Sequence, residues 1–368
     1  MNFVPVNRPL LIGKEKEYVI QAVESGWISS DGPFVEEFEH KFSKKVNRKY
    51  GIAVANGTAA LEISVKALGI TSGQEVIMPT FTIISCALSV LRSGAKPVFI
   101  DAFFDTWNLN TEEIENKINS RTVAIMPVHI YGLPVEMNPI LQLAKKHNLA
   151  IIEDAAEAHG QTYFGKPCGS FGNLSTFSFY ANKHITTGEG GMIVTDDWNL
   201  AEKCRKLRNL CFEPEKRFVH YDLGWNYRMT NLQAALGLAQ LENLENALMR
   251  KKSLGLKYQN SFQNNEFLQT PVLKREGYQN NYWVFGVVVK SKSPKTANQI
   301  MEDLKKEGIG TRPFFWPMHK QPILLDYFQE PLPISEHLSE SGFYLPSGVG
   351  TTSEEIEKVS MKLNEILL

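Results

Sequence analysis

A single lysine ahead of a glycine-rich turn is the feature of this sequence with the clearest chemical potential. Lys183 stands in the segment SFYANKHITTGEGGM, after an apolar run that is typical of a strand and before Gly188, Gly190 and Gly191. This setting would hold the amine near the edge of a sheet, partly removed from water. Burial lowers the pKa of a lysine and makes its amine a nucleophile toward carbonyl groups, with which it forms Schiff bases. Because most loop lysines are solvated surface charges, this interpretation depends on partner residues elsewhere in the chain.

Two candidate carboxylates, Asp154 and Glu157, stand at and after the end of another apolar run, in the segment LAIIEDAAEAHG. Asp154 ends that run, so its side chain should lie at a sheet end, partly buried and in need of a partner. One interpretation is a helix N-cap for the alanine-rich residues that follow. The other is a partner for a protonated ring nitrogen, which in a pyridoxal phosphate enzyme keeps the cofactor an electron sink. Glu157, three residues on, could face the same ligand or the solvent.

The segment IAVANGTAAL has the residues of an anion-binding turn. A strand-like run leads into Gly57 and Thr58 and then into an alanine-rich helix. Backbone N–H groups at a helix start bind anions, and a glycine allows a phosphate to approach closely. An ordinary strand-to-helix turn has the same composition, so this motif alone is weak.

Apolar, β-branched runs alternate with helical patterns through the first two thirds of the chain. Strands separated by helices predict an α/β fold with a mostly parallel sheet covered by helices on both faces. In such folds ligands bind beyond the carboxyl ends of the strands, where the three motifs stand. The expected strands are Ile52–Ala55, Glu75–Met78, Pro97–Asp101, Val123–His129, Leu149–Glu153, Ser175–Phe179 and Met192–Thr195. The expected helices include Ala59–Leu68, Ile84–Arg92, Thr111–Ile118, Pro139–Lys146 and Leu200–Leu207.

The pattern changes from about Thr230 onward. Leucine and alanine recur at helical spacing to about Lys257, which predicts one long helix that could join two domains. The sequence therefore predicts a large domain over residues 1–248 and a smaller α+β domain over residues 249–368. In the smaller domain we expect a β-like stretch (Tyr282–Val289), a helix (Lys295–Glu307), an aromatic, proline-containing loop (Arg312–His319) and a terminal helix (Ser353–Ile366).

The composition excludes several classes of protein. The chain has 368 residues, with 39 Lys and Arg against 40 Asp and Glu and a formal net charge of −1. This balance argues against a protein built to bind nucleic acid or an anionic membrane. The four cysteines form no CxxC pair and no metal site can be assembled from the histidines, so we expect reduced thiols, a cytoplasmic location and no metal. No run reaches the roughly 18 apolar residues of a membrane span.

The anion site, the carboxylate and the amine occur in an order that indicates a family. The chain resembles, over nearly its whole length, the pyridoxal phosphate-dependent nucleotide-sugar aminotransferases of the DegT/DnrJ/EryC1 type, which have the aspartate aminotransferase fold (fold type I). The resemblance implies that Lys183 forms the Schiff base with the cofactor and moves protons. It implies that Asp154 binds the pyridinium nitrogen and that Glu157 approaches the O3′ side. It also implies a phosphate site made of Gly57, Thr58 and Ser178.

The resemblance places further residues around this centre. Asn226, in GWNYRMT, matches a residue that reaches the cofactor phosphate of the neighbouring subunit, which implies a homodimer with shared active sites. Arg312, Trp316 and His319 match a loop near the mouth of the site and are expected to contact substrate. One position departs from the family pattern. Ile83 stands where an aromatic ring usually stacks on the pyridine, and an aliphatic side chain packs there without stacking geometry.

The implied reaction is a two-stage transamination. L-Glutamate would leave as 2-oxoglutarate and convert the cofactor to pyridoxamine phosphate, which would then aminate a nucleotide-linked keto-sugar. The segments PVHIYGLP and GWNYRMTNLQAALGLAQLE look most like members that act at C4 of a GDP-linked 4-keto-6-deoxy sugar, GDP-4-keto-6-deoxymannose. Such members serve the synthesis of surface polysaccharide, the O-antigen of lipopolysaccharide.

Three alternatives stay open. The first is a member that acts on a UDP- or dTDP-linked keto-sugar, at C4 or C3. The second is a dehydratase that uses the same cofactor, but the relatives of that kind replace the lysine with histidine, whereas Lys183 is retained here. The third is a regulatory or interaction protein that keeps the cofactor, and no basic appendage supports it. Arg228 and Arg312 are the candidates for the partner of the glutamate carboxylate.

Overall fold

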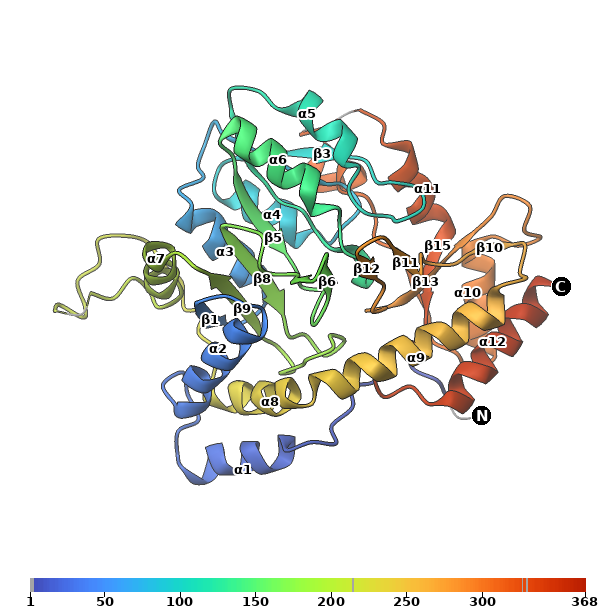
Figure 1. Cartoon of the computed structure of the whole chain (residues 1–368), viewed down its shortest axis with the longest axis horizontal. Helices are drawn as coiled ribbons and strands as arrows, with labels where there is room; N and C mark the ends of the chain where they lie inside the picture. The colour runs from blue at the N-terminus through green and yellow to red at the C-terminus, as the bar shows by residue number, and fades with distance from the viewer. Residues whose placement is uncertain (1–2, 214, 326, 329) are drawn as a thin grey trace.

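A seven-stranded sheet forms the centre of the protein, whose computed structural model describes residues 3–213, 215–325, 327–328 and 330–368 (Figure 1). The strand order is β1-β9-β8-β5-β4-β2-β3. Neighbouring strands are parallel, except that β9 runs antiparallel to both β1 and β8. The mostly parallel α/β sheet confirms the predicted fold class. Its strands are β1 (Tyr50–Val54), β2 (Glu75–Pro79), β3 (Lys96–Ile100), β4 (Thr122–Ile125), β5 (Ala150–Asp154), β8 (Leu174–Ser178) and β9 (Gly191–Thr195).

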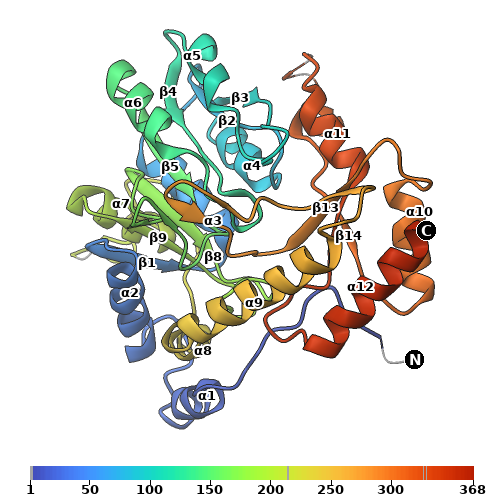
Figure 2. The ribbon, with the colours of Figure 1, turned by 45° about the vertical axis from the view of Figure 1, so that its right-hand side comes forward.

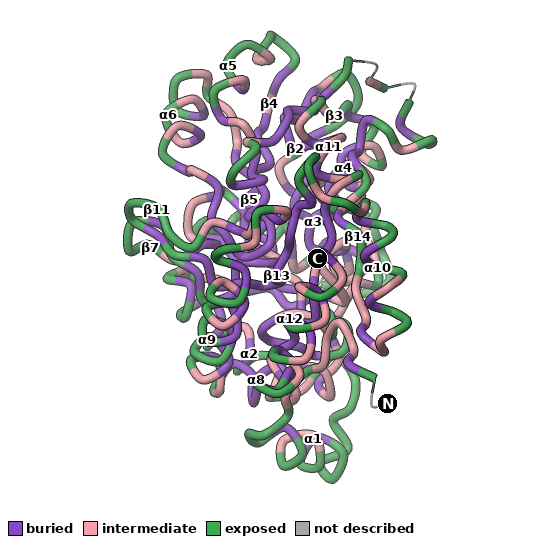
Figure 3. Tube along the Cα trace, turned by 90° about the vertical axis from the view of Figure 1, so that its right-hand side faces the viewer, coloured by how far each residue is buried: buried purple, intermediate pink, exposed green. Residues whose placement is uncertain are grey.

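Helices cover both faces of this sheet, because successive side chains of a strand point to opposite faces. Ile52 of β1 and Ile193 of β9 pack on α3 and α7, whereas the next residues, Ala53 and Val194, pack on α2 and α8. The buried core follows the strands through the molecule (Figure 3). The helices of this part are α1 (Glu15–Glu24), α2 (Pro33–Lys45), α3 (Gly57–Ala67), α4 (Ser85–Arg92), η1 (Thr111–Glu113), α5 (Ile114–Lys117), η2 (Ile130–Gly132), α6 (Met137–His147), α7 (Trp198–Arg208) and α8 (Asn231–Glu242).

The predicted single helix from about 230 to 257 is two helices. Helix α8 ends at Glu242 and α9 (Leu244–Phe262) begins directly after Asn243, whose φ of −101° and ψ of 9° leave helical geometry. The break lets the chain bury two different faces. Leu244 packs in the core beside α2 and α8. Tyr258 packs in the core of a second, smaller sheet that follows α9 in the chain. Helix α9 runs from α8 to that second sheet (Figures 1 and 2).

A smaller antiparallel sheet follows α9, with the order β10-β13-β15-β14. Val4, near the start of the chain, also packs in its core and pairs with Ile309. Helix α9 continues through residue 248, and Val4 packs in the core of the second sheet although it lies near the start of the chain. The domain boundary after residue 248 stays a prediction. The described helices include no segment long and apolar enough to cross a membrane. The elements of this part are β10 (Leu268–Gln269), β11 (Lys274–Arg275), β12 (Tyr278–Gln279), β13 (Phe285–Val289), α10 (Ala297–Lys306), β14 (Arg312–Pro313), η3 (Met318–Lys320), η4 (Pro322–Leu324), α11 (Pro333–Ser341), β15 (Gly342–Leu345) and α12 (Ser353–Leu367), and the short hairpin β6 (Thr162–Tyr163) with β7 (Lys166–Pro167) precedes β8.

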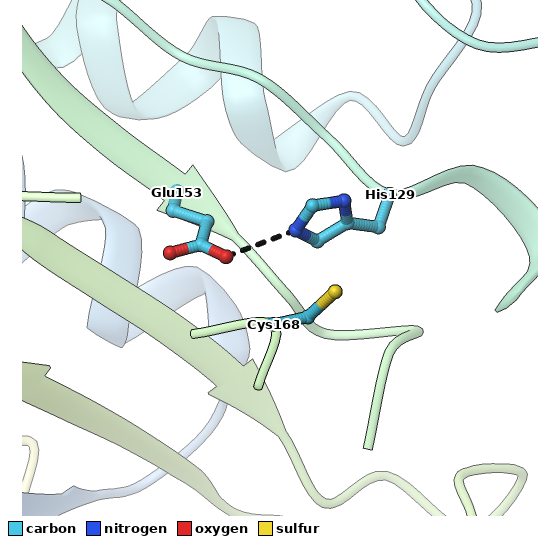
Figure 4. Close-up of side chains that lie close together, drawn as sticks. All are labelled: His129, Glu153 and Cys168. Carbon is cyan, nitrogen blue, oxygen red and sulfur yellow. Dashed lines mark hydrogen bonds and ion pairs between the residues drawn. The ribbon is translucent and has the colours of Figure 1, made fainter. Parts of the chain in front are cut away.

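The buried carboxylate of Glu153 fixes the end of β5, next to Asp154. It accepts hydrogen bonds from the backbone N–H groups of residues 169, 171 and 172, from the Ser175 hydroxyl at 2.8 Å and from His129 Nε2 at 3.0 Å (Figure 4). Cys168 lies beside this pair. The other ring nitrogen of His129 accepts the backbone N–H of residue 135 at 3.1 Å. The lone pairs of Glu153 and His129 that a metal would need are therefore engaged in hydrogen bonds, which makes the cluster a brace for the loop between β7 and β8.

We predict that Glu153→Gln lowers the free energy of unfolding by about 3 kcal/mol, because the amide NH₂ would face backbone N–H groups and leave buried donors without an acceptor. Urea unfolding followed by circular dichroism measures the loss. Glu24→Gln, on an exposed position of α1, is the matched control. A Glu153→Gln variant within about 0.5 kcal/mol of wild type would show that the brace contributes little.

Candidate active site

The predicted motifs converge on one cavity of about 540 Å³ between the two sheets. It lies at the carboxyl ends of β5 and β8 and at the start of α3, where the strand order leads one to expect a ligand. A larger hollow of about 770 Å³ is lined by α3, α4 and the segment 222–227, and its charged pairs, Arg92 with Glu62 and Lys66 with Asp222, satisfy one another. The chemistry therefore belongs to the smaller cavity. The predicted residues that line it are Gly57, Thr58, Ile83, Asp154, Glu157, Ser178, Lys183 and Arg312.

Lys183 projects into this cavity from the turn that follows β8. The turn is closed by a backbone hydrogen bond of 2.9 Å from Lys183 to Tyr180. The Nζ atom of Lys183 lies 3.7 Å from Glu157 Oε1 and 3.7 Å from the centre of the Trp283 ring. Burial lowers the pKa of Lys183, while the nearby carboxylates of Glu157 and Asp154 oppose that shift. The amine is thus held out of water in the setting of a nucleophile.

The two carboxylates are buried and aimed by hydrogen bonds. Asp154 accepts the N–H of Ala156 at 3.0 Å and the thiol of Cys86 at 3.3 Å, and burial raises its pKa. Glu157 accepts the N–H of Tyr131 at 2.8 Å. Burial raises the pKa of Glu157 to about 7, against the pull of the Lys183 ammonium. Each carboxylate keeps acceptor capacity for a ligand in the cavity.

The start of α3 forms an anion cradle. Asn56 caps the helix by accepting the N–H of Ala59 at 2.8 Å, and the hydroxyls of Thr58 and Ser85 lie 2.8 Å apart. A Cβ on Gly57 would lie 2.9 Å from the Cβ of Ser178, so only glycine fits at this close approach. N–H groups at a helix start and three hydroxyls are the donors that a phosphate needs.

Two buried polar atoms on the cavity wall are free to bind a ligand. Thr176 Oγ1 and Asn182 Oδ1 have no hydrogen-bond partner within the described part of the chain. Thr176 lies on β8 directly beside Asp154 of β5. Buried polar groups are nearly always satisfied, so these atoms indicate a bound polar molecule. A phosphate cradle, a carboxylate, a buried amine and unsatisfied polar atoms together fit pyridoxal phosphate.

The remaining predicted residues lie at the rim or outside the cavity. Ile83 and Arg312 line its exposed edge. Asn226 does not line the cavity, and its side-chain oxygen accepts from Arg228 at 2.8 Å. Trp316 is 53% exposed, and its ring N–H donates to the carbonyl of residue 320. His319 is buried, with Thr80 at 2.8 Å on one ring nitrogen and Glu336 at 3.0 Å on the other. Substrate contacts by Trp316 and His319 stay predictions.

Several residues of the site were not among the predicted ones. Trp283 lies just before β13 and Tyr344 lies on β15, so their place in the cavity depends on how the two sheets meet. Cys86 is a buried residue of α4, and its bond to Asp154 has no sequence pattern of its own. Ser85 carried a usable signal, because it begins a helix after a buried strand, as Gly57 does.

We predict that Glu157→Gln changes the stability of the cofactor-free protein in a pH-dependent way. The folded-state pKa of Glu157 is raised from 4.5 to about 7, so protonation stabilises the folded state at low pH and this contribution is lost as pH rises through 7. The variant should therefore gain stability relative to wild type, on the order of 2 kcal/mol, between about pH 5 and pH 8. Urea unfolding across this range measures the difference. Glu189→Gln, on the exposed rim, is the control, and a pH-independent difference for Glu157→Gln would contradict the prediction.

The family follows from comparison with known proteins. A model of the DegT/DnrJ/EryC1/StrS aminotransferase family matches residues 10–364. The chain is 40% identical to GDP-perosamine synthase of Escherichia coli O157:H7 over 99% of both chains. It is 42% identical to GDP-perosamine synthase of Caulobacter vibrioides, over 99% of this chain and 98% of that protein. The solved structure of DesI in the presence of its TDP-sugar product covers 100% of this chain and 93% of its own, with 30% identity and a TM-score of 0.92. Matches of this extent show that the chain belongs to the DegT/DnrJ/EryC1/StrS aminotransferase family, as a sugar aminotransferase that works with pyridoxal phosphate.

Proposed function

We propose that this protein transfers an amino group from L-glutamate to C4 of GDP-4-keto-6-deoxymannose and so makes GDP-perosamine for surface polysaccharide such as O-antigen. The observation that carries the proposal is the buried amine of Lys183, 3.7 Å from Glu157 and opposite the helix start that would hold a phosphate. The choice of sugar nucleotide is supported by relatives named GDP-perosamine synthase that match nearly the full length of the chain.

In this proposal the side chains of the cavity bind the phosphate, bind the ring nitrogen or move a proton. The start of α3, with Thr58, Ser85 and Ser178, holds the phosphate, and Asp154 keeps the ring nitrogen protonated. Pyridoxal phosphate, when bound, supplies the electron sink that stabilises charge at the carbon losing its proton. The amine of Lys183 accepts that proton as a general base and returns it as a general acid.

The open side of the cavity suits an anionic substrate. The exposed Arg312 lies at the rim beside Tyr344, and it forms no ion pair with another described residue. A guanidinium in this position can bind either the carboxylate of glutamate or the diphosphate of a sugar nucleotide in two-pronged fashion. The rings of Phe315, Tyr344 and Tyr180 line the same side and give the sugar an apolar wall.

We also propose that the protein is a homodimer in which residues of one chain reach the active site of the other. Asn226 lies outside the cavity of its own chain, as expected of a residue that serves a neighbour. The segment just before it exposes large apolar side chains, Phe218, Tyr221 and Leu223, each at least 75% accessible. Large apolar side chains exposed within one short segment favour a protein interface.

The central test is Lys183→Ala. The wild type purified with its cofactor should be yellow and should lose that colour when glutamate is added. The variant should bind no cofactor covalently and should lose at least about 1,000-fold in turnover, because it lacks the general acid–base group. Lys16→Ala, an exposed position on α1, is the matched control. Turnover of keto-sugar by Lys183→Ala at the wild-type rate would refute the assignment.

The nucleotide is tested by presenting GDP-, UDP- and dTDP-linked 4-keto-6-deoxy sugars side by side, with mass spectrometry and NMR of the products. We expect the GDP-linked sugar to be aminated with the highest kcat/KM and the new amine to lie at C4. Comparable turnover of a dTDP- or UDP-linked sugar, or amination at C3, would refute the perosamine assignment. A deoxygenated product would indicate a dehydratase instead.

A further inference from the structure

Trp283 contacts both Lys183 and the residue before it. The centre of its ring lies 3.7 Å from the Lys183 Nζ, and its ring N–H donates to the carbonyl of Asn182 at 3.0 Å. The indole therefore contacts both the amine of Lys183 and the peptide unit between Asn182 and Lys183. Trp283 is 4% exposed, so the contact with the amine is made out of water. On another side the amine meets the carboxylate of Glu157.

The backbone of Trp283 is itself anchored. Tyr282 before it has a φ of 52°, an uncommon value for a bulky residue, and its N–H donates to Asn280 at 2.7 Å. The carbonyl of Trp283 accepts a hydrogen bond of 2.9 Å from Lys251 Nζ, which also donates to the carbonyl of Ser347. Lys251 thus joins the chain two residues before β13 to the chain two residues after β15.

Lys251 is an unusual residue for this position. It lies on α9, is 2% exposed, and its bonds within the described residues go to backbone carbonyls and not to a carboxylate. Burial alone lowers its pKa to about 7. Burying a charged lysine without a carboxylate partner costs free energy of folding. It also plays no part in the proposed reaction, since it does not line the cavity.

We propose that Trp283 is a positioning residue for Lys183: its ring receives the protonated amine whenever that amine is free, and Lys251 anchors the ring by holding the Trp283 carbonyl. The catalytic meaning of this device rests on the proposed aminotransferase function. The contact itself is a property of the cofactor-free chain and can be tested there.

The ring of Trp283 offsets the free-energy cost of a positive charge on the buried amine of Lys183. The proton that Lys183 accepts makes an ammonium inside a site that burial makes unfavourable to charge. The negative face of an indole ring attracts a cation strongly when water is excluded. The other titratable groups around the amine are Asp154 and Glu157, which favour the ammonium, and the buried His159 and His184, whose own protonation it opposes. The ring stabilises the ammonium without taking its proton.

The test is the ionisation midpoint of the Lys183 amine in cofactor-free protein. The rate at which acetic anhydride labels Lys183 is measured against pH by mass spectrometry of the peptide. Trp283→Leu should lower the midpoint by about one pH unit, the size of effect expected when a desolvated cation–π contact is lost. Trp283→Phe, which keeps a ring, should lower it less. Easier access of the reagent changes the plateau rate, and easier access of water would raise the midpoint, so a lowered midpoint reports the lost ring contact.

The anchor is tested by Lys251→Met, for which two explanations predict opposite signs. If Lys251 positions Trp283, the midpoint of Lys183 falls as it does in Trp283→Leu. If Lys251 acts only as a nearby positive charge, its removal raises the midpoint. Lys252→Met, an exposed neighbour on α9, is the control. Should Lys251→Met fail to fold, Lys251→Gln keeps one hydrogen bond and should lower the midpoint by a smaller amount.

An unchanged or raised midpoint in Trp283→Leu would overturn the proposal for the ring, and an unchanged or raised midpoint in the Lys251 variants would overturn the anchor. If the variants show the expected shifts of the midpoint but the wild-type protein aminates no keto-sugar, the proposed function is refuted and the contact stays in place. The two failures are therefore distinguishable.

Discussion

The site depends on keeping one amine out of water without locking it in a tight ion pair. Lys183 Nζ lies 3.7 Å from Glu157, longer than an ordinary charged hydrogen bond. Glu157 is held back by the N–H of Tyr131, and Asp154 is held by Ala156 and Cys86. Because the carboxylates are bound to their own neighbours, the amine stays near them and yet remains available to a carbonyl carbon.

The sheet order makes this arrangement a consequence of the fold. Strands β5 and β8 are parallel neighbours, so Asp154, at the end of β5, and Lys183, in the turn after β8, meet at one edge. The antiparallel β9 brings β1 alongside, and α3 then starts within reach of β8, as the contact between Gly57 and Ser178 shows. The second sheet and the segments next to its strands close the cavity with Trp283 and other rings. A site built from both sheets responds to any shift between them.

Sequence reasoning could predict the residues that follow strands but not those that arrive from the second sheet. Gly57, Asp154 and Lys183 each stand next to a buried run, and the geometry of parallel strands converts that local fact into proximity. Trp283 also stands beside a buried run, that of β13, but its place over Lys183 depends on the path of α9 and on how the second sheet meets the first. The break at Asn243, which sets that path, was hidden because the leucine spacing runs on across it. His319 was predicted near the mouth from its loop, while burial between Thr80 and Glu336 depends on α11, a helix outside the predicted elements.

The most direct test of the central assignment is to reduce the cofactor-loaded wild-type protein with borohydride, digest it and locate the modified lysine by mass spectrometry. The account predicts a pyridoxyl group on Lys183, and predicts that it disappears when glutamate is added before reduction. A pyridoxyl group on another lysine, or none on a fully loaded protein, would contradict it.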